Sequence, residues 1–250
     1  MKKIHYLAIC LLATGLAACT QNEEISSLEN QKAITFDTYV GRDAATRASV
    51  IKVDALKTSG FGVLGYYTED DWEETATPNF MYNQKVYGED WGYEPLKYWP
   101  ADGTISFFAY APYIESQTAV GSKLPFKVAT DVDNQVDLSR STSNTTDLDR
   151  NTKKVTFNFN HALARIGFTI KMSEEGSNTL PKDVKIIVEE VSIGKFYSEG
   201  KLDLSANTAT WSDMNAEQMF SIDADNFVGE KADGFVLTKD NTTSALKLNK

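Results

Sequence analysis

Cysteine and histidine, the side chains that most often bind zinc or act as nucleophile and base, are scarce in this chain. Its 250 residues contain two cysteines, Cys10 and Cys19, and two histidines, His5 and His161. His5 and Cys10 lie in a stretch typical of an export signal, which is removed from the mature protein. Cys19 and His161 alone cannot build a zinc cage or an internal disulfide, and any Ser-His-Asp site would depend on His161 as its base. We therefore predict no catalytic residue, no metal site and no cofactor.

Aromatic and acidic side chains could also bind ligands. Trp91, Tyr93, Tyr98 and Trp99 lie close together in the sequence, and an exposed row of such rings would bind sugars. Aromatic residues that alternate along strands belong more often to a core, so both interpretations stay open. The alternate acidic residues at 131–137 resemble a calcium loop, but the required glycine and glutamate are missing, which favours a solvated turn.

The charge balance limits the classes of partner. The chain has 25 Lys and Arg against 35 Asp and Glu, a formal net charge of -10. An acidic chain repels phosphate backbones and anionic lipid, so we predict no nucleic-acid binding and no polybasic docking on a membrane. A hydrophobic content of 42% still allows a sizeable core.

The first residues predict export and a lipid anchor. Two lysines precede an apolar stretch at 4–16, which has the length of a signal peptide and is shorter than the roughly 20 residues that span a membrane. It is followed by a Leu-Ala-Ala-Cys sequence that ends at Cys19 and resembles the bacterial lipobox. The resemblance implies a signal peptide at 1–18, a diacylglycerol on the Cys19 thiol and an acylated tether at 19–31. An ordinary cleavage site is the alternative, although it would leave a lone cysteine at the mature N-terminus.

The tether begins with the polar, acidic residues 20–24. This stretch resembles the short acidic segments that send some lipoproteins to the outer face of the outer membrane. A solvated linker is the alternative. We predict an outer-membrane, cell-surface protein that touches the membrane through its lipid only.

Beyond the tether, the apolar pattern is that of β-strands. Ile34, Phe36, Thr38 and Val40 occupy alternate positions and so share one face of a first strand. Long helical periodicity is absent, apart from a short turn of helix at 50–57. Further strands are predicted at 61–67, 80–87, 95–99, 104–111, 124–129, 134–138, 154–160, 162–172, 184–193, 200–204 and 208–211.

Several segments in order resemble the Bacteroidales-type fimbrillin (Mfa-like) family of lipoprotein pilus subunits. The resemblance implies an all-β, non-enzymatic chain of two transthyretin-like β-sandwich domains at 32–150 and 151–250, with the polar stretch 139–152 as linker or long loop. The segments are the lipobox, Thr46-Arg47-Ala48, residues 61–67, 93–100, 105–113, 157–165 and 200–204, and Trp211.

The C-terminus departs from the family pattern. Fimbrillins usually continue for tens of residues past the region of Trp211, whereas here an alternation that begins at Ala245 stops at Lys250. We expect a second domain that is incomplete, as in a truncated reading frame or a fragment. A specialised tip or terminating subunit is the alternative.

The same resemblance implies how such subunits assemble. The first strand, at 34–40, fills a groove in the N-terminal sandwich until an arginine-specific protease cuts after it. Its loss leaves unpaired backbone groups and open pockets, which a strand from another fimbrial subunit can fill. Thr46-Arg47-Ala48 matches the family pattern, so the resemblance implies a cut between Arg47 and Ala48. A cut at Arg42, or an arginine that is never cut, is the alternative.

Two functions follow as hypotheses. The first is a lipid-anchored fimbrial subunit in adhesion, with other subunits and the protease as partners and a host or glycan surface as target. The second is a surface glycan-binding lipoprotein that uses the aromatic residues from Trp91 to Trp99. Loss of assembly on replacing Arg47 would favour the first, and loss of polysaccharide binding on replacing Trp91 or Trp99 would favour the second.

Overall fold

The regular secondary structure described by the computed structural model is β-strand apart from one short helix, which confirms the predicted all-β class. The structure describes residues 32–40, 53–69, 77–100, 102–131, 134–141, 154–164, 166, 169–170, 175, 179, 181, 186–188, 190–223, 235–237 and 246–247. No helix within these ranges is long and apolar enough to cross a membrane. The described strands are β1 (Phe36–Val40), β2 (Phe61–Thr68), β3 (Met81–Val86), β4 (Thr104–Ala111), β5 (Lys123–Lys127), β6 (Ser139–Ser141), β7 (Val155–His161), β8 (Thr169–Ile170), β9 (Ile186–Val188), β10 (Glu190–Asp203), β11 (Thr210–Asp223), β12 (Phe235–Leu237) and β13 (Leu246–Lys247).

A short helix, α2 (Val53–Ser59), precedes β2. It ends at Gly60, which has a φ of 76° and donates its N–H to the carbonyl oxygen of Leu56 over 2.7 Å. A left-handed residue at this position satisfies a carbonyl at the helix end, and glycine adopts that conformation without steric cost. The turn of helix predicted at 50–57 is therefore present, and its described residues begin at Val53 and end at Ser59.

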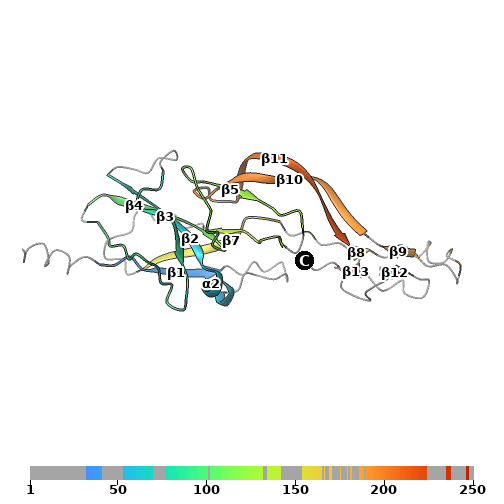
Figure 1. The fold of residues 1–250 in the computed structure, drawn as a ribbon, viewed down its shortest axis with the longest axis horizontal. Coiled ribbons are helices and arrows are strands. Elements are labelled where there is room, and N and C mark those ends of the chain that lie inside the picture. The colour runs from blue at the N-terminus through green and yellow to red at the C-terminus, as the bar shows by residue number, and fades with distance from the viewer. Residues whose placement is uncertain are drawn as a thin grey trace, which may run out of the picture. The chain divides into compact units, whose positions relative to one another are not determined.

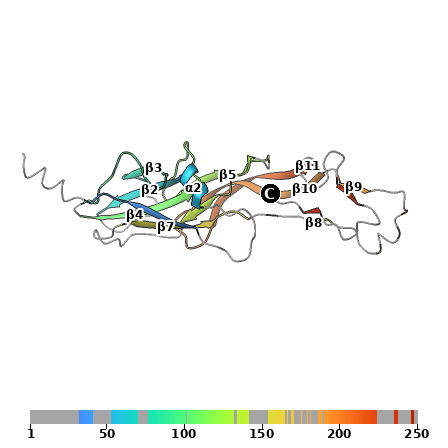
Figure 2. The same ribbon diagram turned by 90° about the horizontal axis from the view of Figure 1, so that it is seen from below.

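The larger sheet has six strands in the order β1-β7-β6-β4-β2-β3. β1 lies at one edge of this sheet and runs parallel to its neighbour β7. All the other neighbouring strands in the sheet are antiparallel. Figures 1 and 2 show β1 in blue beside the yellow β7. Parallel neighbours cannot be joined by a tight hairpin, and here the connection between β1 and β7 contains all the other strands of this sheet.

The smaller sheet has three strands in the order β11-β10-β5. Figure 1 shows β10 and β11 as two long orange strands, and each has 14 residues. β5 pairs with the C-terminal part of β10, where Leu124 lies opposite Leu202. Two short pairs, β9 with β12 and β8 with β13, complete the described strands.

The first hydrophobic cluster, called the aromatic core, lies on one face of the six-stranded sheet. In β7 the residues Val155, Phe157 and Phe159 are buried while Thr156 and Asn158 are exposed, the alternation of a strand with one buried face. The other members come from the first strand, β2 to β4, α2 and the segment between β3 and β4: Ile34, Phe36, Leu56, Phe61, Val63, Met81, Val86, Trp91, Tyr93, Trp99, Ile105, Phe107, Ala109 and Ala111.

The second cluster, called the sheet-to-sheet core, lies between the two sheets and makes them a β-sandwich. The Tyr66 hydroxyl donates to the Gly121 carbonyl oxygen (2.5 Å), and Trp211 Nε1 donates to the Ala162 carbonyl oxygen (3.1 Å). β2 and β4 contribute to both cores, which explains their nearly continuous apolar sequences. The members are Leu64, Tyr66, Phe108, Tyr110, Leu124, Leu138, Ala162, Leu202 and Leu204.

A charged network fastens β5 to β10. The Asp203 carboxylate accepts hydrogen bonds from Lys123 Nζ (2.5 Å), Ser122 Oγ (2.8 Å) and Ser205 Oγ (2.7 Å). Burial alone would raise the pKa of the Asp203 carboxyl, but these donors hold that pKa well below its usual range. The side chain of Arg140 in β6 is also buried, and burial lowers the pKa of its guanidinium while Asp203 opposes this.

Three predicted elements have a different secondary structure from the one predicted. The predicted linker at 139–152 begins with β6, which is polar in composition but buried because β4 and β7 pair with it on either side. Residues 134–138, predicted as a strand, precede β6 without forming one. Residues 95–99 cover the aromatic core as irregular backbone, with a single β-bridge between Tyr98 and Ala33. Strand pairing crosses residue 150 in both sheets, and the division into domains at that residue stays a prediction.

Candidate functional site

The predicted first strand is present in the structure, and one edge of its backbone pairs with β7. The register runs from Phe36 opposite Val155 to Val40 opposite Phe159. Just before β1, the Val155 N–H donates to the carbonyl oxygen of Thr35 over 2.8 Å. The first strand is therefore an edge strand that completes the six-stranded sheet.

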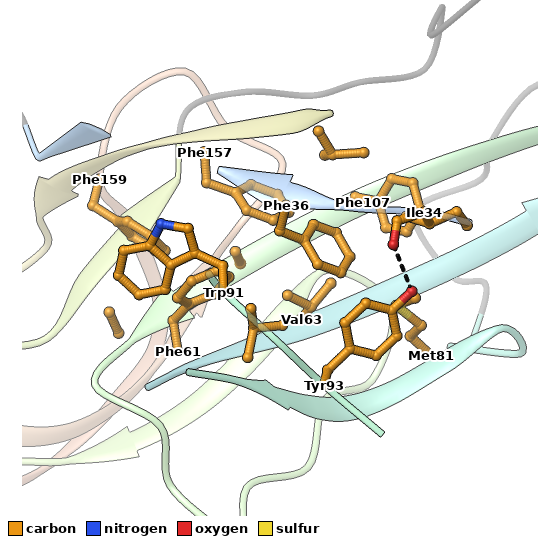
Figure 3. Close-up of a cluster of buried hydrophobic side chains, with 14 of the residues drawn as sticks. Ile34, Phe36, Phe61, Val63, Met81, Trp91, Tyr93, Phe107, Phe157 and Phe159 are labelled. Carbon is orange, nitrogen blue, oxygen red and sulfur yellow. Dashed lines mark hydrogen bonds between the residues drawn. The ribbon is translucent and has the colours of Figure 1, made fainter. Parts of the chain in front are cut away.

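The apolar side chains of the first strand fill a gap in the aromatic core. Ile34 is 0% exposed and Phe36 is 1% exposed. The ring centroid of Phe36 lies 5.3 Å from that of Tyr93, 5.8 Å from Phe107 and 5.6 Å from Phe157, within the range of favourable aromatic pairs. Figure 3 shows Phe36 pointing into this group of rings. The first strand is thus part of the core and not a surface addition.

The segment between β3 and β4 holds the first strand from its other side. The Ile34 N–H donates to the Lys97 carbonyl oxygen over 2.9 Å. The Tyr93 hydroxyl donates to the Ile34 carbonyl oxygen over 2.9 Å, the dashed line in Figure 3, and accepts from the Lys97 N–H over 3.2 Å. We call β7, Tyr93, Phe107 and Lys97 together the strand seat.

Thr38 fits the strand seat less well than its apolar neighbours do. Alternation puts it on the same face as Ile34 and Phe36. Its Oγ1 atom is buried and has no hydrogen-bond partner in the part of the chain that the structure describes. The Thr38 backbone N–H donates to Oδ1 of Asp37 over 2.9 Å, and the next residue, Tyr39, is 59% exposed. Among its described side chains, the strand therefore buries the apolar Ile34 and Phe36 together with one hydroxyl that has no partner.

Three buried tyrosine hydroxyls hold their protons more tightly than an exposed tyrosine would. Burial raises the pKa of Tyr93, although the hydrogen bond with the Lys97 backbone opposes this. Burial also raises the pKa of Tyr66 and of Tyr110. The folded chain therefore keeps these protons to a higher pH than the unfolded chain does, and Tyr93 keeps donating to Ile34.

We expect the free energy of unfolding to be unaffected by these groups below about pH 10, the ordinary pKa of tyrosine, and to fall as the pH rises above it. Denaturant unfolding at a series of alkaline pH values measures this loss. Tyr93→Phe should make the loss shallower, because one of the three groups no longer titrates. Tyr82→Phe, which removes a hydroxyl from a side chain that is 69% exposed, should leave the free energy of unfolding at neutral pH unchanged. An unchanged slope in Tyr93→Phe would contradict the raised pKa of Tyr93 in the folded chain.

A family model described as fimbrillin-like matches residues 46–249, which is most of the chain. The chain belongs to the fimbrillin-like family. This membership confirms the resemblance found in the sequence and the prediction of a structural chain rather than an enzyme.

Two individual proteins are similar to this fimbrillin-like chain. Fimbrium subunit Fim1C of Phocaeicola vulgatus is 35% identical over 129 residues, which cover 48% of this chain and 33% of the relative. The match thus spans about a third of that relative's length. The crystal structure of a candidate cell adhesion protein from Bacteroides uniformis aligns over 88% of this chain and 84% of its own, with 15% identity and a TM-score of 0.46.

The predicted processing residues of the fimbrillin-like chain lie outside the described residues. Arg42, Arg47 and Ala48 fall in 41–52, between the end of β1 and the start of α2, and Cys19 precedes residue 32. Their roles stay predictions. Their positions in the sequence nevertheless matter, because any cut within 41–52 separates β1 covalently from every other described element.

The aromatic platform predicted for sugar binding is not exposed. Trp91, Tyr93 and Trp99 are 8%, 6% and 7% exposed and belong to the aromatic core. Trp91 packs against Phe61 with ring centroids 5.5 Å apart. Tyr98 is 45% exposed, but Trp91 and Trp99, which would have to form the sugar-binding surface with it, are buried. Core packing is therefore the correct interpretation of this segment.

The second histidine of the sequence, His161, has a structural contact. His161 ends β7, and its Nδ1 lies 3.0 Å from Oδ1 of Asp137, just before β6. This pair ties two neighbouring segments of the six-stranded sheet. His161 therefore has a hydrogen-bonding role where β7 meets the segment before β6.

β5 is an edge strand of the smaller sheet. The sequence did not predict how this edge is protected from pairing with a further strand. Pro125 has no N–H to offer, and Nε2 of Gln117 donates to its carbonyl oxygen over 2.6 Å. An open groove of about 690 Å³ runs beside it, and Lys127 and Glu199 on its wall form an ion pair of 2.8 Å. These features reduce the ability of β5 to accept another strand. A proline inside the predicted strand 124–129 was the available signal, since proline within a sheet favours edges.

Proposed function

We propose that this fimbrillin-like chain is a lipid-anchored fimbrial subunit of the cell surface, acting in adhesion, that assembles by exchanging its first strand. One observation carries the proposal. The first strand, which includes β1, lies at the sheet edge and fills the strand seat with Ile34 and Phe36, and it is followed in the sequence by a segment with Arg42 and Arg47. The element that would have to leave is therefore at an edge, buried on its apolar face, and next to arginines.

Cleavage would convert the first strand into a separable ligand. Hydrolysis of the bond between Arg47 and Ala48 leaves a carboxylate on the first fragment and an amine on the second. After the cut, only non-covalent contacts hold the strand in its seat. Its departure would uncover the edge of β7 and the rings of Tyr93 and Phe107. An extended segment of another subunit, apolar at alternate positions, would complete both the sheet and the aromatic core.

The anchor and the location rest on sequence and similarity. The Phocaeicola vulgatus relative is a fimbrium subunit, which supports a surface, fimbrial location for this chain. A lipid on Cys19 would hold the uncut precursor at the membrane. Since Cys19 lies on the N-terminal side of Arg47, the cut that frees the strand seat would also free the body of the subunit from its lipid.

Replacing Arg47 tests the proposal. We expect Arg47→Lys to abolish cleavage by an arginine-specific protease and to remove the ladder of high-mass polymers seen by gel electrophoresis without boiling. Arg42→Lys, the matched control at the other arginine, should assemble normally. Palmitate labelling tests the lipid anchor separately, and this labelling should be lost in Cys19→Ser. Polymers that still form from uncut Arg47→Lys chains would contradict the proposed order of events.

A further inference from the structure

We infer that Thr38 sets how readily the first strand leaves its seat. This inference rests on the proposed function, since it concerns the rate at which β1 is exchanged. The observation behind it is independent of that function: Thr38 Oγ1 is the buried side-chain polar atom without a hydrogen-bond partner in the described part of the chain. A hydroxyl that gives up water and gains no partner destabilises the state that buries it.

The position of Thr38 gives this destabilisation its consequence. Ile34 and Phe36, on the same face, are fully buried and hold the N-terminal part of the strand. Thr38 lies opposite Phe157 in the register with β7, nearer the end of β1 that continues toward Arg47. The uncompensated hydroxyl therefore weakens the end of the strand that a cut would free. Release can begin there, while the apolar end stays bound until a replacement strand arrives.

An incoming strand with an apolar side chain at this position would bind more tightly than the resident strand. It would bury the same face on the strand seat and leave no hydroxyl without a partner. The difference favours exchange in one direction, from the resident strand to the donor strand. Thr38 is thus a residue that determines the outcome of the exchange, and it acts by weakening the precursor.

The test uses the full mature chain, cut with an arginine-specific protease. A fluorescent peptide with the sequence of residues 32–47 is added in excess, and its uptake reports how fast the resident strand leaves. We expect Thr38→Val, which keeps the shape and removes the hydroxyl, to slow uptake about tenfold. It should also raise the melting temperature of the uncut chain by roughly 2–4 °C.

Two further variants separate the hydroxyl from other effects. Thr38→Ser keeps the hydroxyl and should not slow uptake. Tyr39→Phe removes a hydroxyl from the adjacent residue, which is 59% exposed, and should change neither quantity. Equal uptake rates for the original chain and Thr38→Val would overturn the inference about Thr38 and leave the proposed function intact. A cut chain that never takes up the peptide, in any variant, would overturn the proposed function and this inference with it.

Discussion

A chain that ends at residue 150 is expected to remain unfolded. The truncation removes Phe157 and Phe159 of β7 from the aromatic core, and it removes Leu202 of β10 and the following Leu204 from the sheet-to-sheet core. Losing one buried Phe or Leu side chain typically costs about 2–5 kcal/mol. The loss of four such side chains therefore matches or exceeds the roughly 5–15 kcal/mol by which a whole domain is stable. Near-ultraviolet circular dichroism and thermal unfolding measure the result.

The matched control is a chain that ends at residue 223, after β11. It keeps every residue of both cores and both sheets of the sandwich. With the predicted signal removed from both chains, this longer one should give a folded spectrum and a cooperative transition. Cooperative unfolding of the shorter chain would instead support an independent domain at 32–150, and would show that strand pairing across residue 150 is not required for folding.

Phe36→Ala in the intact chain is expected to lower the free energy of unfolding by roughly 3–5 kcal/mol. The side chain is 1% exposed and its ring lies against those of Tyr93, Phe107 and Phe157. These three rings come from different elements, each fixed by its own neighbours, so the cavity cannot readily collapse. Urea unfolding followed by tryptophan fluorescence measures the change.

Tyr39→Ala is the control for Phe36→Ala. Tyr39 is three residues further along the first strand and is 59% exposed, so its truncation should change the free energy of unfolding by about 0.5 kcal/mol or less. Similar values for the two variants would show that the first strand contributes little to the aromatic core. That result would also remove the main support for a strand seat.

Alternation in the sequence was sufficient to find strands with one buried face. The first strand and β7 were both recognised because Phe36, Phe157 and Phe159 alternate with polar residues. Alternation specifies which face of a strand is buried but carries no information about which strand lies beside it. The parallel pairing of β1 with β7, and hence the strand seat, required the structure.

Other features of the fold could not be predicted from the local sequence pattern. β6 is polar in composition, and it is a strand because β4 and β7 provide backbone partners on both sides. The aromatic residues Trp91 and Trp99 were identified, but their sequence could not show whether they cover a core or face solvent. Thr38 was assigned correctly to the buried face, yet only its surroundings reveal that its hydroxyl has no partner there.

The parallel pairing of β1 with β7 also has a consequence for the order in which the molecule is made. Phe36 pairs with Val155, so almost half of the chain lies between the two strands. During synthesis, β1 emerges first but cannot pair until β7 has followed. Closing so long a loop is slow relative to forming the hairpins within it. The newly made chain therefore passes through a state with an empty edge on β7, the same state that a cut after the first strand would produce again in the finished subunit.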